Sequence, residues 1–312
     1  MSFVKQGLLN TQNEEKVIIK SVLCTLFIFY DILNVLFYVI LNNEASKLLT
    51  EVHILRVLFI GDIVGSPGRK AVKQYICDVQ KEYAFDYCIA NGENAAGGSG
   101  ITCVIAKELY GYGIHCITMG NHTWSKKEIT NFIDDDARII RPANYPPELP
   151  GKGSVIIDGR LGVINLLGRV YMDPVDCPFK TLDKELESIK KHVKAVIVDM
   201  HAEATSEKCA LAWHADGRVS AVLGTHTHVQ TADERILPFG TAFLSDVGMT
   251  GPHEGIIGVD REIVLEKFRY AMPVRFEVAK GKVQFNAVVL DIDEKTGKTE
   301  SICRILKVFD LQ

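Results

Sequence analysis

Paired cysteines are missing from this chain of 312 residues. Its eight cysteines stand singly along the sequence, without a C-x-x-C pair. This scatter argues against a disulfide framework and is typical of buried thiols in a reducing compartment. We therefore predict a cytoplasmic location, with membrane anchoring through the N-terminal segment as the alternative.

Long basic tracts and glycine-rich nucleotide loops are absent as well. The formal net charge is −4, which argues against a dedicated binder of duplex DNA but leaves a small nucleotide substrate open. Gly61, Gly65 and Gly68 do not fit the G-x-G-x-x-G spacing, and the glycine and lysine spacing of a Walker loop is not found. Dinucleotide cofactors and P-loop chemistry are thereby disfavoured.

The one long apolar run lies near the N-terminus, at residues 21–41. Fourteen of these 21 residues are Leu, Ile, Val or Phe, interrupted by Asp31 and Asn34. As a helix the run would span roughly 30 Å, enough to cross a bilayer. No convincing small-residue cleavage site follows it, which argues against a secretory signal.

Residues 1–54 read differently from the rest of the chain and form a predicted N-terminal extension. Three interpretations stay open: translated upstream sequence with Leu55 as a leucine-type start, a transmembrane anchor at 21–41, or an additional soluble helix. The lysine bias around the run would export the remainder of the chain. Residues 55–312 form the predicted catalytic domain.

From residue 55 onward, short apolar runs alternate with segments of helical periodicity. Strands are predicted at 56–60, 87–90, 115–119, 155–157, 163–167, 195–200 and 220–223. Helices are predicted at 66–83, 102–112, 125–133, 182–193 and 205–215. The helix at 125–133 rests on the capping-box spacing of Ser125 and Glu128.

Beyond residue 270 the periodicity changes to two. Residues 274–279, 282–292 and 302–308 alternate apolar and polar side chains around turns at Lys280-Gly281 and Lys295–Lys298. This pattern predicts antiparallel strands. The whole order predicts an α/β fold with two packed sheets, helices outside, and antiparallel C-terminal strands.

Polar side chains follow five of the predicted strands at the point where each strand ends. They are Asp62, Glu93 with Asn94, Asn121 with His122, His201, and His226 with His228. In open α/β sheets, sites form in the crevice outside the carboxyl ends of the strands. We therefore expect these groups to meet in one cleft, with the two imidazoles of His226-x-His228 on the same side of an extended backbone.

The chemistry of this set predicts a metal centre. Carboxylate, amide and imidazole donors suit Mn, Fe or Zn, and the lack of thiolates disfavours a structural zinc site. Eight candidate groups are too many for one ion, whereas a carboxylate can bridge two. Two divalent ions would bind phosphate oxygens and align a bridging hydroxide for in-line attack. His122 is the candidate proton donor, because neighbouring Asn121 can hold a metal while the imidazole stays free.

Five runs in this sequence resemble the bacterial YmdB-like family of calcineurin-like metallophosphoesterases. They are LFIGDIVGSPGR at 58–69, NGEN at 91–94, MGNHTW at 119–124, HAEATS at 201–206 and GTHTHVQT at 224–231. The resemblance runs from about residue 55 to the C-terminus and does not cover residues 1–54. It implies a β-sandwich flanked by helices in four layers, an often di-iron centre, and phosphodiesterase activity on cyclic nucleotides, including 2′,3′-cyclic ones.

The resemblance also implies a role for each residue. Asp62, Glu93, Asn94 and His228 would hold the first metal, and Glu93 would bridge to the second. Asn121, His201 and His226 would complete the second metal site, with His122 as the proton donor. These roles make up the predicted site.

Three functions remain open from the sequence. The favoured one is a phosphodiesterase acting on small cyclic nucleotides, 2′,3′-cyclic nucleotides above all, or on short RNA ends. The alternatives are a phosphomonoesterase or 5′-nucleotidase with the same centre, and a nucleotide-sensing regulatory module that affects RNA metabolism. A homo-oligomer is also expected.

Overall fold

The computed structural model describes residues 53–312, together with Tyr30, Leu33, Asn34 and Phe37. These four residues are helical and exposed; the remainder of the predicted span at 21–41 lies outside the described residues. No helix in the described part of the chain is long and apolar enough to cross a membrane. Residues His53–Gln312 form one compact unit.

One sheet has eight strands. Along the sheet run β2 (Asp62–Ile63), β12 (Met249–Pro252), β13 (Val283–Asp293), β1 (Ile54–Ile60), β3 (Tyr87–Asn91), β4 (Cys116–Thr118) and β5 (Ile139–Ile140), and β14 (Thr299–Phe309) also pairs with β13. Strands β1, β3, β4 and β5 are parallel, whereas β13 is antiparallel to both β1 and β14. The predicted C-terminal hairpin is therefore confirmed.

The second sheet has six strands. Their order is β10 (Arg235–Ile236), β11 (Ala242–Leu244), β9 (Ala221–Thr225), β8 (Ala195–His201), β7 (Leu161–Leu167) and β6 (Ser154–Ile157). The four inner strands are parallel, and the two edge strands are antiparallel to their neighbours. The carboxyl ends of β8 and β9 thus lie side by side.

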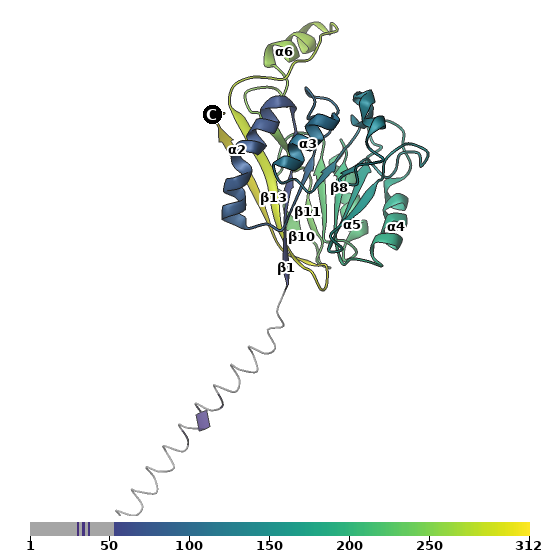
Figure 1. Cartoon of the computed structure of the whole chain (residues 1–312), viewed down its shortest axis with the longest axis vertical. Coiled ribbons are helices and arrows are strands. Elements are labelled where there is room, and N and C mark those ends of the chain that lie inside the picture. Colours follow the sequence, from purple (N-terminus) through teal and green to yellow (C-terminus); the bar gives the residue numbers. More distant parts are fainter. Residues whose placement is uncertain (1–29, 31–32, 35–36, 38–52) are drawn as a thin grey trace, which may run out of the picture. The chain divides into compact units, whose positions relative to one another are not determined.

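Helices cover the outer face of each sheet (Figure 1). Helices α2 (Gly65–Tyr83) and α3 (Cys103–Gly111) cover the larger sheet, and α4 (Pro178–Ile189) and α5 (Thr205–Ala215) cover the smaller one. A further helix, α6 (Arg261–Tyr270), stands away from these layers at the top of Figure 1. The predicted α/β fold, two sheets with helices outside, is confirmed.

The alternation of side chains along β1 shows how the sequence builds these layers. Leu55, Val57 and Phe59 face the apolar layer between the two sheets, while Leu58 and Ile60 face the layer under the helices. All five are fully buried. A strand that is buried on both faces reads as an unbroken apolar run, which is why this strand was predictable.

Two predicted elements are wrong. Residues 125–133 form two short 3₁₀ turns, Thr123–Ser125 and Lys127–Asn131, because Lys126 between them is extended (φ −110°, ψ 106°). Glu128, the predicted capping partner of Ser125, instead accepts a hydrogen bond from the backbone N–H of Cys103 at the start of α3 (3.1 Å).

The predicted strand at 274–279 is likewise absent. Its one ladder contact is an isolated bridge between Val278 and Val259, and Phe276 remains half exposed. Alternating apolar residues predict a strand only where a sheet edge is available to pair with them. Here the preceding segment forms α6, which the sequence did not predict.

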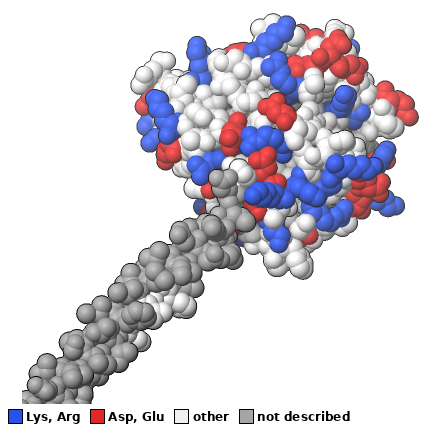
Figure 2. Space-filling model, turned by 60° about the horizontal axis from the view of Figure 1, so that its bottom comes forward, with Lys and Arg blue, Asp and Glu red and all other residues white. Residues whose placement is uncertain are grey.

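The molecular face seen in Figure 2 carries Lys and Arg interspersed with Asp and Glu. Side chains of both signs thus share this face, in keeping with the low net charge of the chain.

Candidate metal centre

All eight predicted site residues lie at one end of the two-sheet core. Strands β1, β3 and β4 of the larger sheet and β8 and β9 of the smaller sheet end here, and each is followed or closed by a polar residue. Hydrogen bonds connect members of the set directly. The backbone N–H of His226 donates to Asp62 Oδ2 (3.2 Å), and the backbone N–H of His122 donates to Glu93 Oε2 (2.9 Å). The structure therefore brings together what the sequence placed on five separate strands.

One group of candidate metal ligands, all with a lone pair to offer, converges on the Nε2 atom of His201. Glu93 Oε1 lies 3.1 Å from this nitrogen, Asn121 Oδ1 lies 3.0 Å away, and His226 Nδ1 lies 3.1 Å away. Glu93 and His201 are buried, and Glu93, His201 and His226 form a cluster whose ligand atoms lie within 4.8 Å of one another. Four electron-pair donors this close together could hold a metal ion.

Hydrogen bonds fix which nitrogen of His201 faces that group. The Thr225 hydroxyl donates to Asp199 Oδ1 (2.7 Å), so its oxygen is free to accept from Nδ1–H of His201 (2.8 Å). Asp199 also accepts from Thr118 and Asn91 and is fully buried. With Nδ1 protonated in this way, the lone pair of Nε2 points at the acceptor group, as in metal-binding histidines.

His226 and His228 are oriented in a similar way but through different atoms. Nε2 of His226 lies 3.2 Å from Glu203 Oε2, which leaves Nδ1 facing the group. Nδ1 of His228 lies 2.8 Å from the carbonyl oxygen of Ile257, which can only accept, so Nε2 carries the lone pair. Each of the three imidazoles thus has one nitrogen occupied by a protein acceptor and the other available.

A second group of candidate metal ligands lies around His228 Nε2. Asn94 Nδ2 lies 2.9 Å from this nitrogen, and Asp62 Oδ1 lies 4.0 Å from it. Asp62 Oδ1 and Asn94 Oδ1 are both buried without a hydrogen-bond partner. Burying an oxygen of a carboxylate in this way is costly unless a cation binds it, so these residues fit the predicted metal.

The pKa shifts also indicate a demand for positive charge. Burial acts to raise the pKa of Glu93, but the His201 imidazole outweighs it and lowers the pKa to about 2. Burial acts to lower the pKa of His201, whereas Glu93 and Asp62 raise it to about 9. Burial raises the pKa of Asp62 to about 6, despite the nearby His228 and His201. Without a metal, a second proton on His201, at Nε2, therefore supplies the positive charge. Metal binding would release this proton and free the Nε2 lone pair.

The backbone around the histidine pair differs from the sequence-based expectation. Strand β9 ends at Thr225, and His226 (φ 101°) and His228 (φ 67°) both have left-handed conformations. The two rings consequently face different partners rather than the same side of an extended strand. Non-glycine residues held at positive φ concentrate at functional sites, where surrounding contacts impose the strain.

A buried ion pair imposes this conformation. Asp246 Oδ2 accepts hydrogen bonds from the backbone N–H (3.0 Å) and the hydroxyl (2.7 Å) of Thr227, the residue between the two histidines. The same oxygen lies 2.8 Å from Lys208 Nζ, and both side chains are only 2% exposed. Removal of one partner from such a pair typically costs about 3–5 kcal/mol, so the pair fixes the loop firmly.

Several supporting residues were missed by sequence reasoning. Gly120 is one: a Cβ there would clash with Glu93 Oε2 and the His201 ring. Its position next to Asn121 was a usable signal, since glycine often marks a close backbone approach. Glu203 lies two residues after His201 and could have been noticed, whereas Asp199, Lys208 and Asp246 carry no local signal for their roles.

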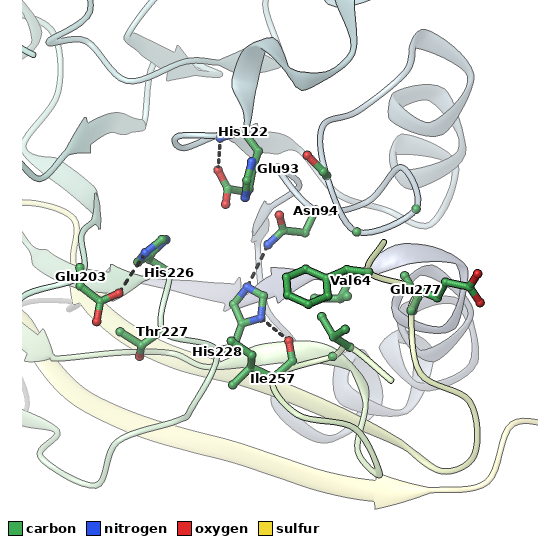
Figure 3. A pocket seen from close by; sticks show the side chains of 17 residues that line it. Val64, Glu93, Asn94, His122, Glu203, His226, Thr227, His228, Ile257 and Glu277 are labelled. Carbon is green, nitrogen blue, oxygen red and sulfur yellow. Dashed lines mark hydrogen bonds and ion pairs between the residues drawn. The ribbon is translucent and has the colours of Figure 1, made fainter. Parts of the chain in front are cut away.

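The cluster opens into a cavity of about 480 Å³. Glu93, Asn94, His122, His226 and His228 form one side of it, and Glu203 contacts His226 at its edge (Figure 3). The ring of His122 is partly exposed, with Nδ1 3.4 Å from Ser125 Oγ. A phosphate ester entering the cavity would meet the candidate ligands of both groups, those around His201 Nε2 and those around His228 Nε2, together with the His122 ring.

Several known proteins are similar to this chain in sequence or in structure. A family model described as YmdB-like protein matches residues 58–305. A 2′,3′-cyclic-nucleotide 2′-phosphodiesterase of Bacillus subtilis is 53% identical over 255 residues, covering 81% of this chain and 97% of that protein.

Two solved structures are similar along their whole length. The crystal structure of a hypothetical protein from Thermus thermophilus has a TM-score of 0.76 at 43% identity and covers 81% of this chain and 99% of that one. The crystal structure of a novel phosphatase from Mycoplasma pneumoniae has a TM-score of 0.78 at 34% identity and covers 83% and 95%.

Fold and site together define a hydrolase of the metallophosphoesterase type, with two sheets flanked by helices and, at the strand ends, a cluster of side chains that could hold a metal ion. Within that class, the chain belongs to the YmdB-like protein family. The resemblance found in the sequence motifs is thereby confirmed.

Proposed function

We propose that this protein hydrolyses small phosphodiesters, with 2′,3′-cyclic nucleotides as its substrates. One observation carries the proposal. Three imidazoles each have one nitrogen occupied by a protein acceptor and the other directed at orphaned or clustered oxygens beside an open cavity. The name of the Bacillus subtilis relative, a 2′,3′-cyclic-nucleotide 2′-phosphodiesterase, supports the choice of substrate.

The donor sets suggest how two divalent ions would be held. Asp62, Asn94 and His228 would bind one ion, Asn121, His201 and His226 the other, and Glu93 would bridge them. Bound ions at such a site supply Lewis acidity and lower the pKa of a bound water. Because all donors are oxygen or imidazole nitrogen, we propose Fe or Mn as the native metal, with Zn as an alternative.

His122 is the proposed proton donor. Its backbone N–H is fixed by Glu93, which places the side chain at the edge of the cavity without engaging it as a ligand. Its contact with Ser125 Oγ occupies Nδ1 and leaves Nε2 to face the substrate. Hydrolysis would form a new bond between a water oxygen and phosphorus and break the P–O2′ bond. A proton on Nε2 would pass to O2′, giving a nucleoside 3′-phosphate.

A phosphomonoesterase activity is the second candidate. The Mycoplasma pneumoniae structure is named a phosphatase, and it is similar to this chain over almost its whole length. Monoesters carry an additional negative charge, which two ions would tolerate equally well. The geometry of the proposed metal ligands does not distinguish diesters from monoesters. Activity measurements on both substrate types are therefore needed to distinguish them.

Substrate range, assembly and location follow from the same proposal. Short RNA ends carrying a 2′,3′-cyclic phosphate present the same reactive group. Exposed apolar residues on and after α6, including Phe268, Tyr270 and Met272, support a homo-oligomer. The seven cysteines in the described part of the chain are free, which supports a cytoplasmic location.

The test is a substrate panel on the full chain loaded separately with Fe(II), Mn(II) or Zn(II). We expect hydrolysis of 2′,3′-cyclic AMP to adenosine 3′-phosphate, with a kcat/KM above that for adenosine 5′-phosphate or p-nitrophenyl phosphate. Metal content measured on the native protein identifies the ion. Faster turnover of the monoesters than of every diester would replace the proposal with the phosphatase alternative.

A further inference from the structure

The cavity beside the metal-binding groups has two chemically different sides. One part of the lining, which begins beside His228 at Ile257, is apolar and has no part in the proposed chemistry. It is formed by Val64, Ile257, Val259, Phe276 and Val278, with Gly97 and Gly98 between them and the predicted ligands. Phe276 supplies the one aromatic carbocycle among the described residues that line the cavity.

The glycines leave the space between the two sides open. Both have left-handed backbone conformations, with φ of 69° at Gly97 and 94° at Gly98. A Cβ at Gly97 would meet nothing within 4 Å, whereas one at Gly98 would lie 3.3 Å from Cγ2 of Val278. The Gly98 N–H donates to the carbonyl of Asn94 (3.1 Å), so this open stretch is attached directly to a predicted metal ligand.

The apolar side is an ordered wall although it contains no regular strand. Backbone hydrogen bonds join Asp260 N–H to the Glu277 carbonyl (2.9 Å) and Ala279 N–H to the Gly258 carbonyl (3.0 Å). The Lys267 ammonium lies 4.6 Å from the centroid of the Phe276 ring. These contacts hold the ring beside the cavity while it remains 48% exposed, so it offers apolar surface to a ligand.

The wall is also linked to the metal side. The carbonyl of Ile257 accepts the hydrogen bond that orients His228, and the Ile257 side chain lines the cavity (Figure 3). Ile257 therefore contacts His228 through its carbonyl and would contact a substrate through its side chain. Glu277 is the one acidic residue on the wall, and its carboxylate points away from His228 in Figure 3.

We propose that this wall is a nucleobase subsite. The base would lie flat against Phe276, Ile257 and Val278 while the cyclic phosphate lies among the predicted metal ligands. The cavity volume of about 480 Å³ falls in the range of small-molecule sites and accommodates a mononucleotide. Because the wall is apolar, stacking and apolar contact dominate recognition, and purines and pyrimidines should both be accepted.

This inference rests on the proposed function, and the experiment separates the two. The full chain, loaded with Mn(II), is assayed on 2′,3′-cyclic AMP and on 1-O-methylribose 2′,3′-cyclic phosphate, which carries the same reactive group without a base. We expect the wild type to show a KM at least about tenfold lower for the nucleotide, the scale of one base–aromatic contact. Phe276→Ala should raise that KM about tenfold, with little change in kcat and none for the base-free substrate.

Matched variants control for indirect effects. Phe276→Trp retains an aromatic face and should keep the low KM. Phe239→Ala removes a phenylalanine that is 67% exposed between β10 and β11 and does not line the cavity, so it should behave as the wild type. The base-free substrate reports whether Phe276→Ala has damaged the metal side.

Binding measurements keep the inference testable without turnover. By calorimetry, the wild type should bind adenosine 3′-phosphate more tightly than 1-O-methylribose 3-phosphate, and Phe276→Ala should lose the difference. Equal affinity of the wild type for both, or equal effects of Phe276→Ala on both substrates, would overturn the subsite and leave the proposed function standing. Base-dependent binding without hydrolysis of either cyclic phosphate would uphold the subsite and overturn the proposed function.

Discussion

The two sides of the cavity are built in different ways. On the metal side, Asp62, Glu93 and His201 are at most 1% exposed and come from strand ends of two sheets. On the wall side, Ile257 and Phe276 are about half exposed and belong to irregular segments joined by a few backbone hydrogen bonds. Chemistry that needs fixed distances is placed on the rigid sheets, whereas substrate recognition is placed on connecting segments.

The difference predicts how substitutions will act. A change on the metal side disturbs groups that share buried atoms, so its effect should be large and should include metal binding. A change on the wall removes contact with the substrate alone. Three variants on the metal side, taken from the largest expected effect to the smallest, test how far this contrast holds.

His201→Ala should give the largest effect. The variant loses the nitrogen around which Glu93, Asn121 and His226 converge, and Glu93 Oε1 loses its buried imidazole partner. We expect no detectable turnover of 2′,3′-cyclic AMP and a reduced metal content by elemental analysis. His214→Ala is the matched control, because His214 lies on the surface of α5 against Asp183 and should leave both quantities unchanged.

Wild-type metal content in His201→Ala would show that the clustered donors are not ligands. The contrast between the two sides would then lose its physical basis. A folded, metal-free and inactive variant, verified by circular dichroism, is the expected outcome.

The same contrast explains what could be predicted from the sequence. Residues such as Asp62 and Glu93 follow buried apolar strands. A parallel sheet places such residues together beyond the carboxyl ends of its strands, whatever the details of packing. The fold and the convergence of the site were therefore predictable. The wall was not: residues 274–279 have a strand-like pattern but pair through a single bridge, because no sheet edge reaches them.

Contacts between distant residues were also beyond the sequence. Nothing near Thr227 shows that Asp246 and Lys208 will hold it, or that His226 and His228 will consequently adopt positive φ. The tautomer of His201 likewise depends on Thr225 of the neighbouring strand β9, whose hydroxyl is oriented by Asp199 of β8. Such roles arise from packing between elements, for which a local pattern gives no signal.

His122→Ala should give an intermediate effect. The side chain has no contact with the clustered oxygens, so the variant should retain its metal content. Its rate on 2′,3′-cyclic AMP should fall by about 10²–10⁴-fold, the usual contribution of a general acid. A substrate with a better leaving group, such as a p-nitrophenyl diester, needs less protonation and should lose less.

Equal rates for wild type and His122→Ala would remove this residue from the mechanism. A loss of metal in the same variant would instead make it a ligand. The comparison of leaving groups separates a proton donor from a residue that only binds phosphate, since binding would affect both substrates equally.

Glu203→Ala should give the smallest effect of the three. Glu203 Oε2 contacts Nε2 of His226 and so fixes the nitrogen that faces the cluster, but the carboxylate is 49% exposed and water can partly replace it. Loss of a group that orients a metal-binding histidine typically weakens metal affinity about 10–100-fold, and the exposure favours the lower end. We expect weaker Mn(II) binding by calorimetry and a kcat that recovers at saturating metal.

Glu203→Gln distinguishes orientation from charge. Its amide oxygen can still accept the hydrogen bond from Nε2–H, so this variant should retain most of the metal affinity that Glu203→Ala loses. Glu262→Ala, on the exposed surface of α6, is the matched control and should not change it. If Glu203→Gln is as defective as Glu203→Ala, the negative charge itself matters, and Glu203 belongs with the charged groups of the centre. The metal side of the cavity would then include Glu203 as well as His226.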